Sequence, residues 1–181
     1  MTFETTDIKD VLIVRPKTFP DSRGYFRELT RTNVLAENGI TEAFVQTNNS
    51  FSTKGVIRGM HYQLKNAQSK LVCATYGEIY DVIIDIRKES PTFGKWIGVN
   101  LSAERGELLY VPKGFAHGFQ VLSDFASVVY QCSDYFTPGD EYGINCFSKA
   151  LGIDWKDIPN VISEKDKLLP DFSIVPSDCF L

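Results

Sequence analysis

The sequence is short of histidine and cysteine and has no long apolar run, and each shortage excludes a class of protein. Among 181 residues there are two histidines and four cysteines (Cys73, Cys132, Cys146 and Cys179), and no Cys-x-x-Cys pair occurs. Such scattered cysteines, two of them inside apolar runs, predict reduced core thiols rather than disulfides. No apolar stretch approaches the roughly 20 residues that a membrane helix needs, so no membrane partner is expected.

Positive charge is neither in excess nor clustered. The formal net charge is −4, and the chain has no dense stretch of Lys and Arg. Nucleic-acid binding depends on many phosphate contacts, so no nucleic-acid partner is expected, and an anionic ligand must be bound by a few placed cations. The first seven residues carry acid where a secretory signal needs basic residues followed by an apolar block. We therefore expect a cytoplasmic protein.

The length and composition favour one domain. A chain of 181 residues with 43% hydrophobic content supplies one sizeable core and too little material for two. We expect a single domain over residues 1–181, with a C-terminal tail from about residue 156. Three prolines, Pro159, Pro170 and Pro176, interrupt that tail, so it should wrap the surface with at most a helical turn at residues 163–167.

Short runs rich in Val, Ile, Tyr and Phe, separated by Gly, Pro, Asn and Asp, predict an all-β sandwich or barrel. Strands are expected at residues 11–15, 43–50, 56–63, 70–76, 79–86, 96–101, 108–111, 116–122 and 127–135. One short helix is expected at residues 33–38, with an asparagine cap and a stop at Gly39. Residues 77–86 are almost continuously apolar, which predicts a strand covered on both faces, by the barrel interior and by a second sheet or subunit.

Both histidines occupy patterned positions. Gly55 precedes His61 by five intervening residues, and Pro112-Lys-Gly114-Phe-Ala-His117 follows a Pro-x-Gly-x-x-His pattern. The two segments together resemble the cupin superfamily, which implies a cupin-type jelly-roll β-barrel. A metal-binding cupin would continue its first motif with a second His and a Glu, and His61-Tyr-Gln63 has neither. We therefore expect no metal and no cofactor.

A neutral imidazole suits proton abstraction near neutral pH if a carboxylate on its other nitrogen fixes the tautomer. His61 is the candidate base, although two hydrogen-bonded core histidines are the plainer alternative. Arg58 lies three residues earlier, so a regular strand would point the two side chains to opposite faces. We predict a bulge at Gly59 that turns both inward.

Several segments, in order and with fitting intervals, resemble the dTDP-4-dehydrorhamnose 3,5-epimerase family. They are Phe19-Pro-Asp-Ser-Arg23-Gly-Tyr-Phe26-Arg-Glu28, Phe44-Val-Gln46-Thr47-Asn48-Asn-Ser50, Ile57-Arg58-Gly-Met-His61-Tyr-Gln63, Ser69-Lys70-Leu-Val72, Asp85-Ile-Arg-Lys-Glu-Ser-Pro-Thr-Phe93-Gly, Val111-Pro-Lys-Gly-Phe-Ala-His117-Gly-Phe119, Tyr130 ahead of Tyr135-Phe136, Gly152-Ile-Asp-Trp155 and Ser163-Glu-Lys-Asp166. The chain departs from the family pattern at residues 145–149, close to Glu141.

The resemblance implies an isomerase of dTDP-L-rhamnose and O-antigen biosynthesis. Its substrate would be a dTDP-4-keto-6-deoxyhexose, inverted at sugar carbons 3 and 5 through an enolate. The family pattern implies that His61 is the base, oriented by Asp166, that Tyr130 is the acid, and that Lys70 lies beside the enolate oxygen. Taken alone, Tyr130 would be read as a core tyrosine and Lys70 as a surface lysine that starts a strand.

The resemblance also implies a set of substrate contacts and a homodimer. Phe26 and Tyr135 would stack on thymine, and the segment 23–28 would cross to the neighbouring subunit, although alone it would be read as a hairpin with solvated charges. The implied binding residues are Arg23, Phe26, Glu28, Gln46, Thr47, Asn48, Arg58, Lys70, His117, Tyr135, Glu141 and Lys165.

Three alternatives stay open at this point. An epimerase that inverts one carbon, or one that uses another deoxysugar nucleotide, would need the same base, acid and lysine. A metal-dependent cupin would need three or more ligands. A non-catalytic sugar-binding cupin would keep the cations and aromatics but would have no use for the combination of His61, Lys70 and Tyr130.

Overall fold

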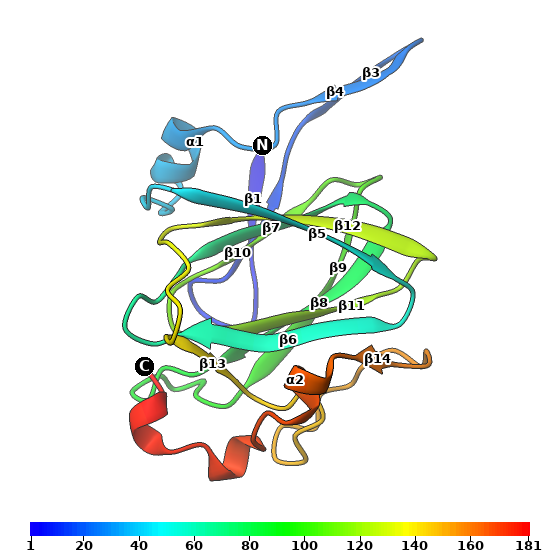
Figure 1. The fold of residues 1–181 in the computed structure, drawn as a ribbon. Coiled ribbons are helices and arrows are strands. Elements are labelled where there is room, and N and C mark those ends of the chain that lie inside the picture. The colour runs from blue at the N-terminus through cyan, green and yellow to red at the C-terminus, as the bar shows by residue number, and fades with distance from the viewer.

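A computed structural model describes residues 1–181 as two sheets packed face to face (Figure 1). The first sheet contains, in spatial order, β1 (Thr2–Thr5), β2 (Leu12–Arg15), β10 (Leu108–Val111), β7 (Lys70–Tyr76), β12 (Phe125–Cys132) and β5 (Gln46–Thr53). The second contains β13 (Glu141–Gly143), β6 (Val56–Gln63), β11 (Phe115–Val121), β8 (Glu78–Asp85) and β9 (Trp96–Ser102), and β14 (Val161–Ile162) pairs with β6 in parallel. This arrangement confirms the all-β class and is that of a cupin-like jelly roll.

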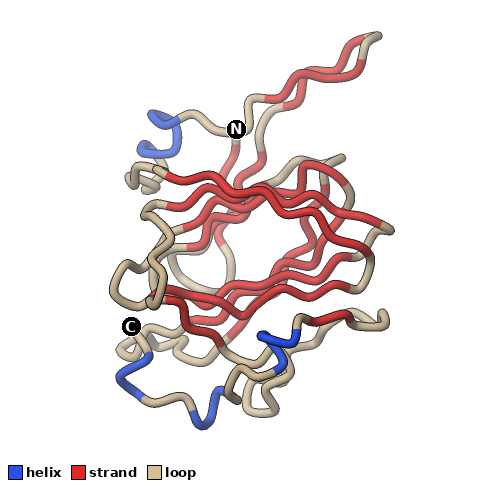
Figure 2. Tube along the Cα trace, viewed as in Figure 1, coloured by secondary structure: helices blue, strands red, loops and turns tan.

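A separate hairpin of β3 (Thr18–Asp21) and β4 (Gly24–Arg27) projects away from the first sheet (Figure 2). Arg27 anchors its base, because the guanidinium donates to the carbonyls of Ala103 at 3.0 Å and Glu104 at 2.7 Å. The helical elements are short: α1 (Thr32–Glu37), α2 (Glu164–Lys167) and two 3₁₀ turns, η1 (Phe172–Ile174) and η2 (Ser177–Cys179). None of the helices has the length and apolar character needed to cross a membrane.

The main core lies between the two sheets, where alternate residues of each strand point inward. Val72 and Ala74 of β7 and Val128 of β12 pack there with Ile83 of β8 and Phe119 of β11. Since side chains alternate along a strand, residues two apart from these also face the interior. This alternation places the polar residues of the same strands between the sheets.

The outer face of the second sheet is covered by the chain's own C-terminal segment. Tyr80 and Val82 of β8 pack with Trp155 and Phe180, and the orange to red ribbon lies along this face in Figure 1. The expectation that a second sheet or subunit covers β8 was therefore wrong, because the Pro-interrupted tail provides enough aromatic area to do so. The expected irregular wrapping of this tail is confirmed.

The outer face of the first sheet is partly covered by α1 and the loop that follows it. Leu35 and Ile40 pack there against Leu71 of β7. The helix begins after Arg31 with no side-chain cap, so the expected asparagine cap at its start was wrong. The glycine stop is confirmed, because Gly39 has φ +87°, a conformation that favours glycine.

The observed strand boundaries agree best with the expected ones for strands inside the sheets. β6, β7 and β10 occupy the expected residues 56–63, 70–76 and 108–111. The strand expected at 43–50 starts and ends three residues later, and that expected at 127–135 covers Phe125–Cys132. The edge strands β1, β13 and β14 were not expected, whereas the hairpin indicated by the segment 23–28 taken alone is present as β3 and β4. All four cysteines are free thiols, and three of them are buried.

Candidate active site

A cavity of about 590 Å³ opens between the two sheets, and 22 residues line it. Its walls come from β5, β7 and β12 of the first sheet, from β6, β11 and β13 of the second, and from β14 and α2. Most of the polar residues expected in the site meet here. They are Gln46, Asn48, Arg58, His61, Lys70, His117, Tyr130, Glu141, Lys165 and Asp166.

His61 is held by a carboxylate that comes from the far end of the chain. The pairing of β14 with β6 brings the following residue, Ser163, alongside, and its hydroxyl caps α2 by accepting from the Asp166 amide at 3.1 Å. The Asp166 carboxyl oxygen Oδ1 then lies 2.7 Å from Nε2 of His61. A carboxylate only accepts hydrogen bonds, so Nε2 carries the proton and Nδ1 is left as an acceptor.

The bulge predicted at Gly59 is confirmed. On β11, His117 pairs with His61 and Phe119 with Arg58, so one residue of β11, Gly118, lies opposite two of β6, Gly59 and Met60. Gly59 has φ +134°, and a Cβ there would lie 2.5 Å from the Gly118 backbone, so a side chain does not fit. The bulge turns Arg58 and His61 into the same cavity, where Arg58 donates from Nε to Ser52 Oγ at 3.0 Å.

Lys70 projects into the cavity from the start of β7. It shares the inward face with Val72 and Ala74, which lie in the core between the sheets. Its ammonium belongs to none of the ion pairs of the chain. Burial lowers the Lys70 pKa from its ordinary value, while the charges of Asp81 and Glu141 oppose the shift. The cavity thus contains a cation without a fixed counter-ion.

Tyr130 faces the cavity from the first sheet, opposite the β6 strand that carries His61. It pairs with Asn48 on one side and Val72 on the other. Burial raises the Tyr130 pKa above its ordinary value of 10.0, and the neighbouring Arg58 only partly offsets this. The phenol therefore keeps its proton at neutral pH and is able to donate it.

His117 is a buried member of the cavity wall. Its Nε2 lies 2.9 Å from both carboxyl oxygens of Asp81, which is fully buried. The structure thus makes His117 a hydrogen-bonded core histidine, the plainer alternative for that residue, and also places it in the cavity wall, where it was expected.

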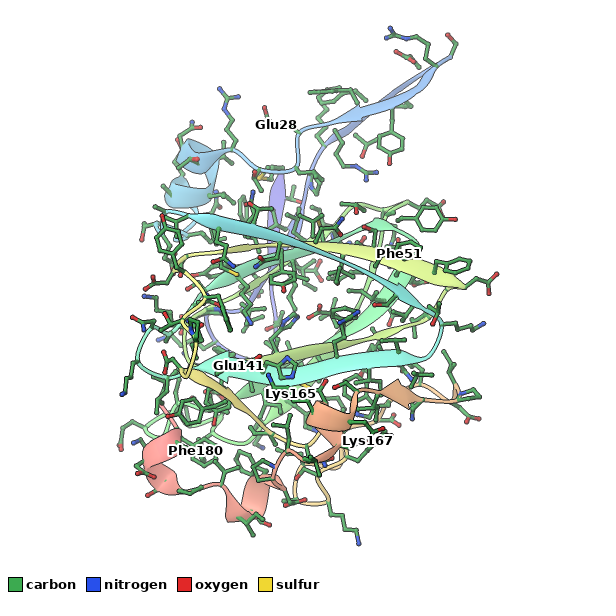
Figure 3. All side chains as sticks on the ribbon, viewed as in Figure 1. Glu28, Phe51, Glu141, Lys165, Lys167 and Phe180 are labelled. Atoms are coloured by element: carbon green, nitrogen blue, oxygen red, sulfur yellow. The ribbon has the colours of Figure 1, made fainter.

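The polar residues of β13 and α2 pair with each other at the cavity. Lys165 forms an ion pair with Glu141, and Figure 3 shows the two labelled side by side near β6. At the same end, Gln46 donates to Asn48 at 3.0 Å and accepts from the Phe136 amide at 2.9 Å.

Some expected contacts do not reach this cavity. Arg23 and Phe26 lie on the projecting hairpin, and Glu28 lies at its base, beyond the first sheet (Figure 3). Thr47 is exposed on the outer face of β5, because its neighbours Gln46 and Asn48 take the inward face. Tyr135 is 63% exposed, and the next residue, Phe136, lines the cavity instead.

Several cavity residues were given no role in the sequence analysis, although Ser50, Gln63 and Ser163 lie in the segments that carry the family resemblance. Ser50, Gln63 and Gln68 line the wall, and Ser163 positions Asp166. Alternation along β5 pointed to Ser50, which lies two residues after Asn48. The departure at residues 145–149 lies outside the cavity; there the Asn145 side chain donates to backbone carbonyls of the C-terminal segment.

No group of three or more His, Cys, Asp or Glu side chains is arranged so that it could hold a metal ion.

Comparison with known proteins gives a consistent set of relatives. The family described as dTDP-4-dehydrorhamnose 3,5-epimerase matches residues 5–173. A protein of Shigella flexneri with that same description is 52% identical over 163 residues, covering 89% of this chain and 90% of the relative.

Solved structures are similar over nearly the whole chain. A dTDP-6-deoxy-D-glucose-3,5-epimerase from Legionella pneumophila, in complex with dTDP-4-keto-L-rhamnose, has a TM-score of 0.96 and 42% identity, covering 99% of this chain and 96% of its own. A 3'-monoepimerase from Streptomyces bikiniensis, in complex with dTDP-quinovose, has a TM-score of 0.86 and 32% identity, and the match covers 93% of this chain and 86% of the monoepimerase.

Proposed function

Because the chain belongs to the dTDP-4-dehydrorhamnose 3,5-epimerase family, we propose that it inverts carbons 3 and 5 of a dTDP-linked 4-keto-6-deoxyhexose. One observation carries the proposal: a histidine–carboxylate pair and a protonated tyrosine come from opposite sheets of one cavity, with an unpaired lysine beside them. Inversion requires a base and an acid on opposite faces of the sugar, and the two sheets provide those two faces.

The first step is removal of a proton. The ketone at carbon 4 acidifies the hydrogens at carbons 3 and 5, and Nδ1 of His61 takes one of them. The electron pair of the broken C–H bond becomes the enolate double bond, and negative charge moves to the oxygen at carbon 4. Asp166 stabilises the imidazolium that forms, since it accepts from Nε2 at 2.7 Å.

The second step is reprotonation from the other face. Lys70 donates to the enolate oxygen, a role in which removal of one donor typically costs about 10²- to 10³-fold in rate. Tyr130 then gives its phenolic proton to the carbon from the first sheet, and the inverted configuration results. Release of the proton from His61 to water and uptake of a proton from water by Tyr130 restore both groups. The other carbon adjacent to the ketone then undergoes the same two steps.

The remaining polar residues of the cavity bind the nucleotide and sugar in this proposal. Arg58, Lys165 and His117 meet the diphosphate or sugar, since guanidinium and ammonium groups suit phosphate oxygens. Gln46, Asn48 and Glu141 contact neutral polar groups. Thymine stacks on an aromatic side chain at the Gln46 end, where Tyr135 and Phe136 lie.

We also propose a homodimer in which each hairpin completes the neighbour's site. The hairpin projects with Tyr25 57% and Phe26 67% exposed, and an isolated two-stranded hairpin is marginally stable without a partner surface. Arg23, Phe26 and Glu28 would then reach the partner's nucleotide. A cytoplasmic location fits the three buried free thiols, which stay reduced there.

Deuterium exchange tests the reaction. The protein is incubated with dTDP-4-keto-6-deoxyglucose in deuterated water, and the sugar is followed by NMR. Exchange at carbons 3 and 5 with formation of the inverted product is expected, and His61→Ala should abolish exchange while it still binds dTDP. Absence of exchange with the wild-type protein would refute the proposed activity.

A single-carbon epimerase is the second candidate. The Streptomyces monoepimerase has the same fold at 32% identity, so the architecture serves both outcomes. Exchange confined to carbon 3 or carbon 5 in the same experiment would select this candidate.

Mixing two inactive variants tests the shared site. His61→Ala keeps a normal hairpin, and an Arg23→Ala/Phe26→Ala variant keeps a normal cavity. A mixed dimer then contains one complete site, so activity should return when the two variants are refolded together. Two folded variants that stay inactive after mixing would refute the crossing hairpin.

A further inference from the structure

Ser50 has a hydroxyl that the protein buries and leaves without a hydrogen bond. Among the buried side-chain nitrogen and oxygen atoms of the chain, only Ser50 Oγ has no partner. Ser50 also lines the cavity between the sheets. An unbonded buried hydroxyl costs free energy in the free protein, so its presence in a ligand cavity indicates a partner supplied by the ligand.

The neighbours of Ser50 on β5 already have partners. Gln46 donates to Asn48, and Asn48 donates to the Cys132 sulfur. Ser52, two residues further on, accepts from Nε of Arg58 at 3.0 Å. Ser50 is thus the one member of the inward-facing row whose polar group has no hydrogen bond within the protein.

The sheet register places Ser50 next to the proposed acid. On β12, Asn48 pairs with Tyr130 and Ser50 with Val128, so Ser50 and Tyr130 are diagonal neighbours. Diagonal neighbours in a sheet are about 7–8 Å apart, within reach of an aromatic side chain. The residues beside Ser50 in its own row, Val128 and Ala74, are apolar. The Ser50 hydroxyl is therefore the polar side-chain group of the row formed by Ser50, Val128 and Ala74.

Ser50 also lies far from the end that we assign to thymine. Ser50 lies four positions after Gln46 on β5, or about 13 Å along an extended strand. Gln46 contacts the Phe136 amide, so the aromatic residues Tyr135 and Phe136 lie at that end. The position of Ser50 therefore corresponds to the sugar rather than to the base.

We propose that Ser50 is a specificity-determining residue whose hydroxyl hydrogen-bonds an oxygen of the sugar ring beside Tyr130. The assignment rests on the proposed function for the identity of the sugar nucleotide. A serine hydroxyl donates and accepts, so it matches a sugar hydroxyl or carbonyl.

The assignment predicts that Ser50→Ala affects the stability of the free protein and the binding of the sugar in opposite directions. Ser50→Ala removes an unsatisfied group from the free protein, so the unfolding midpoint should stay equal or rise. The same substitution removes a hydrogen bond from the complex, so kcat/KM should fall about 5- to 10-fold. A purely structural serine would instead lower the unfolding midpoint.

The experiment compares Ser50→Ala with Ser127→Ala. Ser127 lies on the neighbouring strand β12, outside the cavity, and donates to Asn49 at 2.9 Å. Its variant should keep the wild-type kcat/KM. Calorimetry with dTDP and with unreactive dTDP-glucose distinguishes a contact with the sugar from a contact with the nucleotide. Ser50→Ala should lower the affinity for dTDP-glucose and leave the affinity for dTDP unchanged.

Three results for Ser50→Ala would overturn the proposal. An unchanged affinity for dTDP-glucose would mean that the hydroxyl binds only water, and an equal loss of affinity for dTDP would mean that it contacts the nucleotide. A lower unfolding midpoint would mean that the serine is structural. Failure of the proposed function looks different. There the wild-type protein would show no exchange at carbons 3 and 5, while the calorimetric difference between dTDP-glucose and dTDP would still test Ser50.

Discussion

His61 and Asp166 are 105 residues apart in sequence, yet Nε2 of the histidine lies 2.7 Å from Oδ1 of the aspartate. This contact depends on three local features in succession: the pairing of β14 with β6, the Ser163 cap and the single turn of α2. The candidate base is thus oriented by a segment that lies outside both sheets for most of its length.

Replacing the Asp166 carboxylate by an amide should slow proton removal without changing the shape of the cavity. Asp166→Asn keeps the size of the side chain but loses the charge that stabilises imidazolium, so kcat should fall by about 100-fold or more. Glu164→Gln is the matched control, because Glu164 lies on the same turn, is exposed and pairs only with Lys167. Equal rates for the two variants in the NMR assay would contradict the role of Asp166.

Tyr130→Phe should separate the two half-reactions. The variant loses the acid and keeps the base, so inversion should slow more than deuterium incorporation does. NMR of the recovered sugar measures both, since incorporated deuterium and inverted configuration are resolved separately. Equal slowing of the two processes would show that Tyr130 does not act as the proton donor.

Lys70 should set the alkaline limit of activity. Burial lowers its pKa from 10.5, so as pH rises Lys70 loses its proton earlier than an ordinary lysine, and kcat should fall there. The raised pKa of Tyr130 moves that group's titration the other way, to higher pH. Lys70→Arg, which stays charged, should move the fall in the pH profile to higher pH. An unchanged profile would exclude Lys70 as its origin.

Lys165 should affect ligand binding more than stability. Its ion pair with Glu141 is partly exposed, with 65% of the lysine side chain accessible, and such pairs contribute at most about 1 kcal/mol. Lys165→Gln should therefore unfold near the wild-type temperature, bind dTDP more weakly, and show a smaller effect of salt on binding. Lys167→Gln, which lies outside the cavity, is the control. Equal dTDP affinities for the two variants would contradict a phosphate contact.

Phe180→Ala tests the C-terminal cover of the second sheet. Phe180 is 7% exposed, and its ring centroid lies 5.2 Å from those of Phe93 and Phe172. Truncation of such a side chain costs about 3 kcal/mol, or about 6 to 12 °C in Tm for a chain of this size. Ile174→Ala should have little effect, because Ile174 is 70% exposed. Calorimetric unfolding measures both, and a Tm within 2 °C of the wild type for Phe180→Ala would contradict the cover.

Much of the candidate site could be predicted because several segments resemble the epimerase family, and the alternation of side chains along strands accounts for their meeting in one cavity. His61, Lys70 and Tyr130 lie on β6, β7 and β12, and two of these strands have the expected residues. The bulge at Gly59 was also predictable, since a three-residue spacing conflicts with inward placement of both Arg58 and His61. The same alternation excluded Thr47 from the cavity, although the family pattern had included it.

By itself the sequence determined the all-β class and the core strands, because period-two patterning and turn residues act locally. Its resemblance to the epimerase family implied the roles of His61, Lys70 and Tyr130. Only the tertiary structure decided how Asp166 reaches His61, what covers β8 and which buried hydroxyl is left without a partner. Those features depend on which distant segments pack together, and a linear pattern contains no direct measure of spatial proximity.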